Sequence, residues 1–460
     1  MVTIARPIAK AVTKEDYLAA AKGIAQHLRQ EAVKTEVGTY WQKTEQGEPI
    51  LDFYVGSSGI ALFLIQLAAI TGEASYLEEA IAAGNFIVNK LEAGNYSEHL
   101  TLGWAFSDVQ ANSRFAFHGN GYAGIAFSLI ELTKATGDAS YAHAAHKIID
   151  EIVINAKEVT SGVIWSGYSG IQQDFGTALF LLYAADYFKE EQLKKLAVKA
   201  GLAILSTEIP THEGGARYTG FKNVLDVYHQ GNPDNLHFPN YAYGTSGIGH
   251  GFATLYQATG DERFLEGAKK AATYLIAISE EVSDGKLIPY LQPKNAENIF
   301  YLGFCHGPAG SARLFYDLYT LTNEPQYLTF FDDLIEGIIA TGAPEKHSTG
   351  YWQIHCQCCG SAGVLQFLTE AYIASKNEKY LTYALRTADA ILGEGHIDET
   401  QTAKWYQAWT RTKPADIQNH LGYLIGDAGL GGAYAELYGF LAVPDYTAIR
   451  LPDDPFPAHR

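Results

Sequence analysis

Apolar and polar positions follow one another along this chain in blocks that recur. Residues 61–69 (ALFLIQLAA) are apolar on nearly every side of a helix, as expected for a helix buried on all faces. Residues 76–91 (YLEEAIAAGNFIVNKL) instead carry Glu and Lys on one face, which is typical of a half-exposed helix. Blocks of these two kinds alternate along the sequence, so the pattern predicts an all-α fold built from helix pairs.

A Gly-x-x-Gly motif precedes each apolar block. Residues 56–67 read GSSGIALFLIQL, and six later stretches have the same form. The seven copies begin near residues 56, 121, 167, 244, 307, 360 and 426. Self-similarity at intervals of this kind indicates a repeat architecture. Each motif is therefore expected to start the first helix of a pair.

Short polar turns separate the two helices of a pair. The segments TGEASYLEEA (71–80) and TGDERFLEGA (259–268) combine Thr, Gly and an acidic residue. These residues favour a turn followed by the N-cap of a new helix. The aromatic residue that comes next is expected to anchor the second helix by packing.

Seven buried helices surrounded by seven half-exposed ones predict an α/α toroid, a closed barrel of helix pairs. An open solenoid of helix pairs is the alternative. The first and last copies are as apolar as the middle ones, whereas the ends of an open array usually carry polar caps. We therefore expect the ring to close and residues 1–460 to form a single domain.

Long irregular inserts come after a second helix and before the next glycine motif. They cover residues 205–243, 279–304, 341–357 and 393–422. All of them should emerge on the face where the apolar helices begin. Because a rigid scaffold often carries its functional groups on such loops, the working site is expected at this mouth.

Composition and charge narrow the choice of partner. The chain has 51 acidic and 33 basic residues, a formal net charge of −18, and no run of five or more Lys/Arg. Binding to nucleic acid or to an anionic membrane surface is therefore not expected, because both need clustered cations. The sequence also has no Gly-x-x-x-x-Gly-Lys-Ser/Thr loop, so no phosphate-binding loop of that kind is expected.

The N-terminal residues contain no continuous apolar run, and no uninterrupted apolar stretch reaches about 18 residues. Neither a signal peptide nor a membrane span is expected. The four cysteines lie close together rather than scattered as in a secreted disulfide framework. This favours a metal or redox site in a reducing compartment, and hence a cytoplasmic protein.

The cysteines occur only in FCHGPAG (304–310) and HCQCCGSAG (355–363). Cys305 stands two residues before the first glycine of the fifth copy, while Cys358 and Cys359 stand two and one before that of the sixth. Equivalent positions of adjacent repeats lie side by side, so these three thiols should converge.

Three thiolates with an open fourth position favour a catalytic Zn²⁺ site, because structural zinc sites are closed by four protein ligands. Two alternatives are buried apolar cysteines and a structural site closed by a fourth thiol or a histidine. Cys356 does not fit the register of the other three, and we expect it not to be a ligand.

The seven helix pairs, with CHG in the fifth copy and CCG in the sixth, resemble the lanthionine synthetase C-like family over residues 15–440 or so. The resemblance implies an α/α toroid with one zinc at its mouth and three ligands, here Cys305, Cys358 and Cys359, in the Cys, then Cys-Cys variant of the family pattern. It also implies activation of a thiol for Michael addition to dehydroamino acids, which forms thioethers. The expected partner is a dehydrated, cysteine-containing peptide or a small thiol.

The chain departs from the family at the expected acid–base positions. The family histidine falls at Tyr243, the family acid at Val163 and the family arginine near Tyr301. His306, Tyr243 and His355 are the residues we expect to take over proton transfer, on position alone. His118, also at the mouth, is a further candidate, whereas Asp174 is expected to be a satisfied helix residue.

Two other functions remain in competition with thioether formation. The missing histidine and acid favour a zinc-containing protein that binds a peptide or thiol without cyclase activity. Carbohydrate enzymes also use α/α toroids, but they need paired carboxylates at the mouth. No Asp or Glu recurs at the glycine face, so the carbohydrate function is the weakest of the three.

Overall fold

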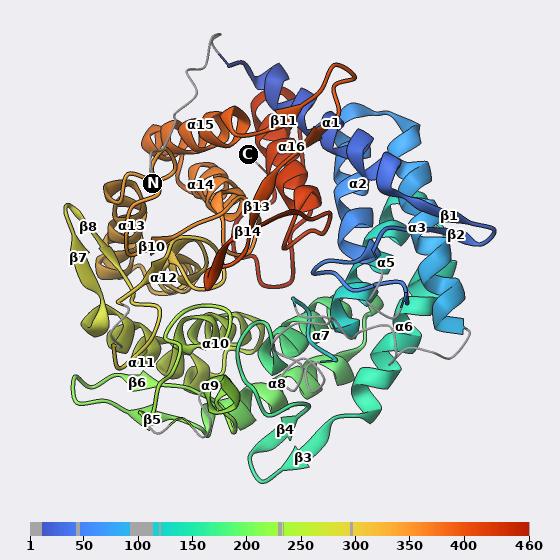
Figure 1. The fold of residues 1–460 in the computed structure, drawn as a ribbon. Coiled ribbons are helices and arrows are strands. Elements are labelled where there is room, and N and C mark those ends of the chain that lie inside the picture. Colours follow the sequence, from blue (N-terminus) through green and yellow to red (C-terminus); the bar gives the residue numbers. More distant parts are fainter. Residues whose placement is uncertain are drawn as a thin grey trace.

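The computed structural model describes residues 12–42, 47–92, 114–118, 121–228, 232, 234–294 and 298–459. Its helices form two concentric rings around a common centre (Figure 1). The expected α/α toroid is confirmed. None of the helices in the described ranges combines the length and apolar character needed to cross a membrane.

The inner ring consists of the apolar helices that follow the glycine motifs. In the described part of the chain it comprises seven helices: α2 (Ser57–Thr71), α5 (Tyr122–Thr136), α7 (Asp174–Phe188), α10 (Thr245–Thr259), α12 (Pro308–Thr322), α14 (Ser361–Ser375) and α16 (Asp427–Ala442). Most of their residues are buried on every face, as the absence of a polar stripe predicts.

The outer ring consists of the amphipathic helices. Six of them follow their inner partners directly: α3 (Ala74–Glu92), α6 (Ala139–Ile154), α8 (Glu191–Leu205), α11 (Glu262–Ile278), α13 (Pro325–Ala340) and α15 (Glu378–Gly393). The polar turns between the helices behave as expected. Asp138, Asp261 and Asn377 cap α6, α11 and α15, and each accepts a hydrogen bond from the backbone N–H two residues later.

The seventh outer helix comes from the other end of the chain. Helix α1 (Lys14–Glu31) packs against α16, the last inner helix, while α16 also packs against α2 (Figure 1). The Tyr17 hydroxyl donates to Asp389 of α15 at 2.6 Å, and Lys22 pairs with Glu73 beside α3 at 2.6 Å. The N-terminal helix thus fills the gap between the sixth and first pairs and closes the ring.

The second glycine of each motif lets the backbone that precedes an inner helix pack directly against the first turn of that helix. A Cβ on Gly310 would lie 2.1 Å from the carbonyl oxygen of Phe304, and one on Gly363 would lie 2.2 Å from that of Gln357. The backbone before each inner helix passes directly over the helix's first turn, so no side chain fits there.

In the third repeat, the expected start at residue 167 is wrong. Helix α7 begins at Asp174, with Gln173 at the N-cap and Gly176 as the close-packed glycine. The pair Gly167 and Gly170 lies ahead of the helix, where Gly170 passes under the backbone of the next repeat. Two overlapping glycine spacings occur in this stretch, and sequence alone did not distinguish them.

Short two-stranded hairpins follow most outer helices. They are β1 (Val33–Thr35) with β2 (Gly38–Tyr40), β3 (Lys157–Val159) with β4 (Gly162–Ile164), β5 (Ile209–Pro210) with β6 (Ala216–Arg217), β7 (Glu280–Val282) with β8 (Gly285–Leu287), and β11 (His396–Ile397) with β12 (Ala403–Lys404). A tryptophan follows three of the hairpins. The indole N–H of Trp41, Trp165 or Trp405 donates to a carbonyl oxygen near the end of the preceding outer helix at 2.7–2.8 Å.

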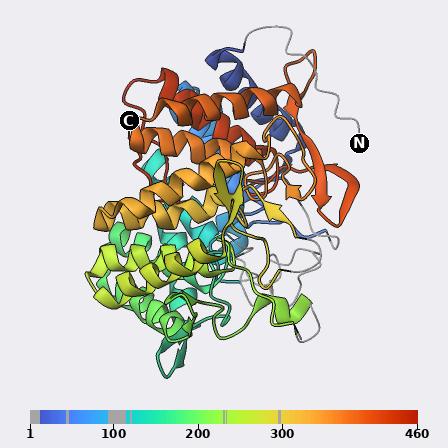
Figure 2. The same ribbon diagram turned by 90° about the vertical axis from the view of Figure 1, so that its left-hand side faces the viewer.

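The longer inserts gather on one side of the ring (Figure 2). They contain α9 (Val224–Tyr228), the parallel pair β9 (Phe300–Tyr301) and β10 (Tyr351–Trp352), and the hairpin of β13 (Tyr406–Thr410) and β14 (Lys413–Asn419). Residues 229–231, 233 and 295–297 of these inserts lie outside the described residues. In Figure 1 the β13–β14 hairpin reaches over the centre of the ring.

The C-terminal segment after α16 enters the ring from the opposite side (Figure 2). Asp453 pairs with His118 at 2.8 Å and accepts a hydrogen bond from Tyr241 at 3.0 Å. Arg450 pairs with Glu370 of α14 and Glu436 of α16, each at 2.8 Å. The tail therefore holds several inner helices together from within.

Candidate metal centre

A chain of backbone hydrogen bonds runs around the mouth of the toroid, one link per repeat. Each N–H of the chain donates to the carbonyl oxygen of the equivalent residue in the next repeat at 2.7–2.9 Å. We call this chain the collar, and its members among the described residues are, in order, Gln172, Ala242, Cys305, Cys358, Leu424 and Tyr54. The link from Leu424 to Tyr54 joins the last repeat to the first. The collar places Cys305 and Cys358 side by side.

Three sulfur atoms converge at this point of the collar. The Sγ atoms of Cys305, Cys358 and Cys359 all lie within 4.8 Å of one another. Cys305 and Cys359 are 3.1 Å apart, and Cys358 and Cys359 are 3.8 Å apart. Cys305 and Cys358 are buried, whereas Cys359 is half-buried and gives the cluster its exposed side.

This arrangement fits a metal ion. Zinc binds thiolate at about 2.3 Å, and tetrahedral geometry then separates two sulfurs by about 3.8 Å. The two sulfur–sulfur distances of 3.1 and 3.8 Å are at or below this value, so the three thiols are close enough to share one ion. Three sulfurs leave one tetrahedral position free, which is the coordination of a catalytic zinc site rather than a structural one.

The surroundings of the three thiols differ. The Tyr54 hydroxyl donates to Cys358 Sγ at 3.2 Å, and the Gln172 side-chain amide lies 3.8 Å from the same sulfur. Hydrogen bonds from the two neighbouring thiols and from Tyr54 lower the pKa of Cys358 well below its usual value. Burial raises the pKa of Cys305. Cys358 is therefore the sulfur that carries negative charge most readily.

Cys356 does occupy a repeat position, contrary to expectation. It stands four residues before the first glycine of its motif, as Asp52 does in the first repeat. Asp52 accepts the N–H of Val55, three residues later, at 2.8 Å, and the Cys356 sulfur accepts the N–H of Cys359 at 3.3 Å. Cys356 thus shapes the turn that carries Cys358 and Cys359.

His306 lies in an aromatic box beside Cys305. Its ring centroid is 4.6 Å from that of Phe238, 5.0 Å from Tyr290, 5.5 Å from Tyr301 and 5.7 Å from Tyr243. Burial lowers the pKa of His306 to about 4, so the ring is a neutral imidazole at pH 7. A neutral imidazole can accept a proton but does not donate one as an imidazolium.

The other predicted proton carriers are placed differently. Tyr243 shares the aromatic box with His306. His355 pairs with Glu394 at the end of α15 through its Nε2 atom at 3.3 Å, and no described contact joins it to the sulfurs. Val163 is buried in β4, so the expected acid position holds only an apolar side chain.

Asp174 and His118 have structural partners. Asp174 accepts hydrogen bonds from the backbone N–H groups of Trp165, Ser166 and Gly167 at 2.9–3.2 Å, as expected for a satisfied helix residue. His118 is fully buried and paired with Asp453. It lies below the collar, among the side chains that close the ring's centre.

Aromatic rings form a floor beneath the collar. Phe53, Tyr241, Phe304 and Tyr423 each stand one residue before a collar member. The rings of Tyr241 and Phe304 are 4.9 Å apart, those of Phe53 and Tyr423 are 5.1 Å apart, and His118 lies 5.3 Å from Phe304. The floor is tied to the C-terminal segment, because Tyr241 bonds to Asp453 and His118 pairs with the same carboxylate.

Sequence reasoning missed three residues near the cluster. Tyr54 and Gln172 belong to repeats far from the cysteines in sequence, and only closure of the ring brings them to Cys358. Arg411 lies at the tip of the β13–β14 hairpin, with its guanidinium 5.7 Å from the Tyr290 ring centroid. The collar position of Tyr54, two residues before a motif glycine, was a usable signal, whereas nothing in the sequence marked Arg411.

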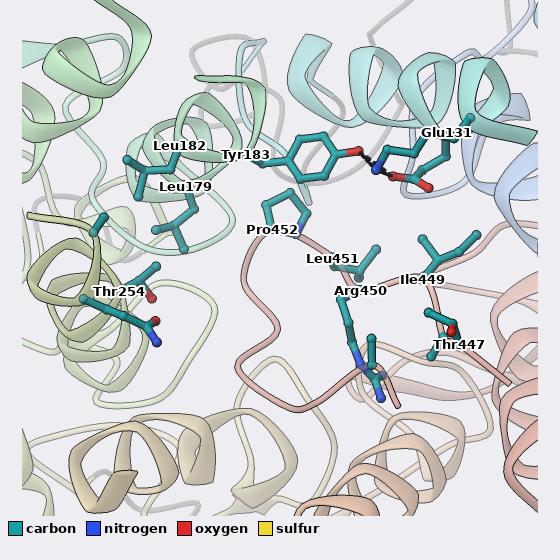
Figure 3. A pocket seen from close by; sticks show the side chains of 15 residues that line it. Glu131, Leu179, Leu182, Tyr183, Thr254, Thr447, Ile449, Arg450, Leu451 and Pro452 are labelled. Atoms are coloured by element: carbon teal, nitrogen blue, oxygen red, sulfur yellow. Dashed lines mark hydrogen bonds and ion pairs between the residues drawn. The ribbon is translucent and has the colours of Figure 1, made fainter. Parts of the chain in front are cut away.

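A separate cavity of about 640 Å³ lies among the C-terminal halves of α5, α7 and α10 and the C-terminal segment (Figure 3). Three of its polar side chains bond to one another. Tyr183 donates to Glu131, and Lys134 lies 2.8 Å from Glu131 and 2.9 Å from Tyr183. Its lining includes no cysteine or histidine. The three-cysteine cluster and His306 thus lie at the mouth and apart from this cavity.

Comparisons with known proteins agree with this arrangement. A family model described as lanthionine synthetase C-like protein matches residues 118–352 and 241–439. Nisin cyclase has a similar structure, with a TM-score of 0.61 and 15% identity over 94% of this chain and 95% of its own. At this identity the similarity establishes the fold alone. A comparison with curated proteins found no match.

Two sugar-processing enzymes give lower structural scores. An unsaturated glucuronyl hydrolase from Bacillus sp. GL1 has a TM-score of 0.46 and 14% identity over 85% of this chain and 98% of its own. D-mannose isomerase has a TM-score of 0.46 and 13% identity over 74% of this chain and 90% of its own.

Proposed function

This chain belongs to the lanthionine synthetase C-like family, and we propose that it is a zinc-dependent enzyme that adds a thiol to a dehydroamino acid. The metal ligands are Cys305, Cys358 and Cys359. The single observation that carries the proposal is the convergence of these three sulfurs at the mouth of the toroid. A reducing compartment, here the cytoplasm, suits a protein with four free cysteines.

The reaction joins a thiol sulfur to the β-carbon of dehydroalanine or dehydrobutyrine. The S–H proton leaves, a C–S bond forms as the π bond breaks, and the α-carbon takes up a proton. Zinc held by three thiolates would supply a Lewis acid that binds the incoming thiol and lowers its pKa. The protein must then accept one proton, return one proton, and stabilise the enolate that forms in between.

Proton transfer is assigned to the aromatic box beside Cys305. His306 directly follows Cys305 and is assigned the transfer of the thiol proton on its position; its low pKa means that it would pass the proton on and not hold it. Tyr243, whose ring centroid is 5.7 Å from that of His306, is suited to return a proton to the α-carbon. His355 takes a secondary part as a partner of Glu394 at the edge of the mouth.

Arg411 supplies the positive charge that an enolate requires. The hairpin that carries it reaches over the centre of the ring, and its guanidinium lies 5.7 Å from the Tyr290 ring centroid. Tyr290 in turn contacts His306. A cation close to the developing oxyanion stabilises the transition state electrostatically.

The partner is a dehydrated, cysteine-containing peptide or a small thiol with a dehydrated acceptor. Half-buried Cys359 is the member of the cluster that is most accessible to such a substrate. Because the proposed step adds a thiol to an existing double bond, the acceptor must already be dehydrated when it reaches the site.

A second function is a zinc-containing protein that binds a peptide or thiol without joining them. The specific observation in its favour is Val163, an apolar residue at the family's acid position. Under this alternative the metal site and mouth would be retained while proton return is lost.

One assay separates the two functions. The purified protein is incubated with a peptide that contains one cysteine and one dehydroalanine, and unreacted thiol is then alkylated and counted by mass spectrometry. Loss of alkylation without a mass change is expected for the wild type and not for Cys359→Ala. If the wild type binds zinc and the peptide but the thiol stays alkylatable, the binding function holds. If the wild type binds no zinc, both proposals fail.

A further inference from the structure

Two side chains donate hydrogen bonds to one sulfur of the metal site. The Tyr54 hydroxyl lies 3.2 Å and the Gln172 side-chain nitrogen 3.8 Å from Cys358 Sγ. Tyr54 belongs to the first repeat and Gln172 to the third, whereas Cys358 belongs to the sixth. The two donors therefore reach the same atom from different parts of the ring.

The other two sulfurs have no such donors. Among the described residues, no side-chain nitrogen or oxygen forms a hydrogen bond with the Sγ atom of Cys305 or Cys359. Each of these two sulfurs contacts only neighbouring sulfurs within hydrogen-bonding distance. Of the three sulfurs, Cys358 Sγ is thus the one with side-chain donors among the described residues, although Cys305 is also buried.

The donors are held in place by the collar. The backbone oxygen of Tyr54 accepts the N–H of Leu424 at 2.9 Å, and the oxygen of Leu424 accepts the N–H of Cys358 at 2.8 Å. On the other side of the ring, the Gln172 N–H donates to Ala242 at 2.9 Å. Closure of the ring thus fixes the distance from Tyr54 to the metal site.

We propose that Tyr54 and Gln172 are positioning residues that tune the metal centre through Cys358. A hydrogen bond to a thiolate withdraws electron density from the sulfur, so the sulfur donates less to the metal and the metal remains a stronger Lewis acid. Such partners also hold the ligand in its binding orientation, and their loss commonly weakens metal binding by about 10–100-fold. This inference rests on the metal site of the proposed function.

The test uses the full-length protein loaded with Co²⁺, whose sulfur-to-metal charge-transfer band reports the electron density on the thiolates. Tyr54→Phe and Gln172→Met each remove one donor and keep most of the side-chain volume. Tyr423→Phe is the matched control, because it also removes a buried hydroxyl, but one that forms no hydrogen bond with a sulfur among the described contacts. Affinity for Co²⁺ is measured by competition with a chelator.

Tyr54→Phe is expected to move the band to longer wavelength and to weaken Co²⁺ binding by about 10-fold or more. Gln172→Met should shift the band and weaken Co²⁺ binding in the same direction but by less, since its donor is more distant from the sulfur. Tyr423→Phe should change neither the band nor the Co²⁺ affinity. If Tyr54→Phe does not fold, the Gln172→Met spectrum decides the matter.

Wild-type spectra from both donor variants would overturn the inference and leave the metal site intact. A band shift as large in Tyr423→Phe as in Tyr54→Phe would also overturn it, because the effect would then be a general loss of packing. If the wild type takes up no Co²⁺, this inference falls together with the proposed function.

Discussion

The backbone N–H of Cys305 donates to the carbonyl oxygen of Cys358 at 2.9 Å, so two cysteines 53 residues apart are adjacent members of one hydrogen-bonded collar. The same pattern of bonds continues around the mouth and joins the last repeat to the first. The metal site is thus part of the structure that closes the ring. Changes in the collar are expected to affect metal binding, and changes in the cysteines need not unfold the protein.

Cys358→Ser should abolish stoichiometric zinc binding, whereas Cys356→Ser should retain about one zinc per chain. The reason is that Cys358 Sγ belongs to the three-sulfur cluster, while Cys356 only accepts the N–H of Cys359, which a serine oxygen also does. Metal content is measured on purified protein, with folding checked by circular dichroism. Retention of zinc by a folded Cys358→Ser protein would contradict the ligand assignment.

Gly303→Ala should weaken zinc binding and destabilise the fold. An added Cβ would lie 2.5 Å from the carbonyl carbon of Cys359 and 2.7 Å from the nitrogen of Gly360, so the fifth and sixth repeats must move apart. Forced overpacking of this kind costs about 1–3 kcal/mol. Gly393→Ala is the control, since nothing lies within 4 Å of its added Cβ.

The free energy of unfolding of both glycine variants is measured by chemical denaturation, and their zinc affinity is measured in parallel. Gly393→Ala is expected to be neutral or slightly stabilising, because alanine favours the helix. Equal stability of the two variants would show that the contact between Gly303 and Cys359 is not tight.

Asp52→Asn should stabilise the protein at neutral pH and flatten its pH dependence. Burial raises the pKa of Asp52 to about 6, and among the described contacts its Oδ2 atom has no hydrogen-bond partner. The folded state therefore holds a proton that the unfolded state releases near pH 4. The contribution of this group to stability is greatest below pH 4, falls as pH rises from about 4 to 6, and is constant above that.

The expected gain at pH 7 is on the order of 2–3 kcal/mol, since one pKa unit corresponds to about 1.4 kcal/mol. The asparagine oxygen keeps the bonds from Val55 and Gly56 that Asp52 Oδ1 accepts. Urea unfolding at pH 4, 5, 6 and 7 provides the measurement. If the free energy of unfolding of the variant falls between pH 4 and 6 as steeply as that of the wild type, Asp52 is not the source of this pH dependence.

Arg450→Met should destabilise the protein by about 3–5 kcal/mol. Arg450 pairs with Glu370, Glu436 and Asp454, all buried, so its removal leaves charges without compensation. Arg386→Met is the control, because its exposed pair with Glu345 is worth only about 0–1 kcal/mol. If thermal unfolding shows the same loss of stability in both variants, the C-terminal segment does not hold the ring together.

Much of the architecture could be predicted from local pattern. Apolar blocks such as residues 61–69 have no polar face to expose, so they had to become inner helices, and the amphipathic blocks had to surround them. The third repeat was misplaced because Gly167, Gly170 and Gly176 allow two spacings, and only the close approach of Gly176 to the Ile171 carbonyl oxygen selects one. The hairpin and tryptophan after several outer helices went unnoticed, because the repeat they form is short and interrupted by inserts.

The helix pairs and the matching register of the three cysteines could be predicted from sequence, because helical periodicity and repeat position are local properties of the chain. The folded structure was needed to show that helix α1 completes the last pair and that Tyr54 and Gln172 reach Cys358. It also shows that Arg450 and Asp453 of the C-terminal segment fill the centre. These contacts join residues far apart in sequence, including the two ends of the chain. Their partners are set by closure of the ring, which no local pattern encodes.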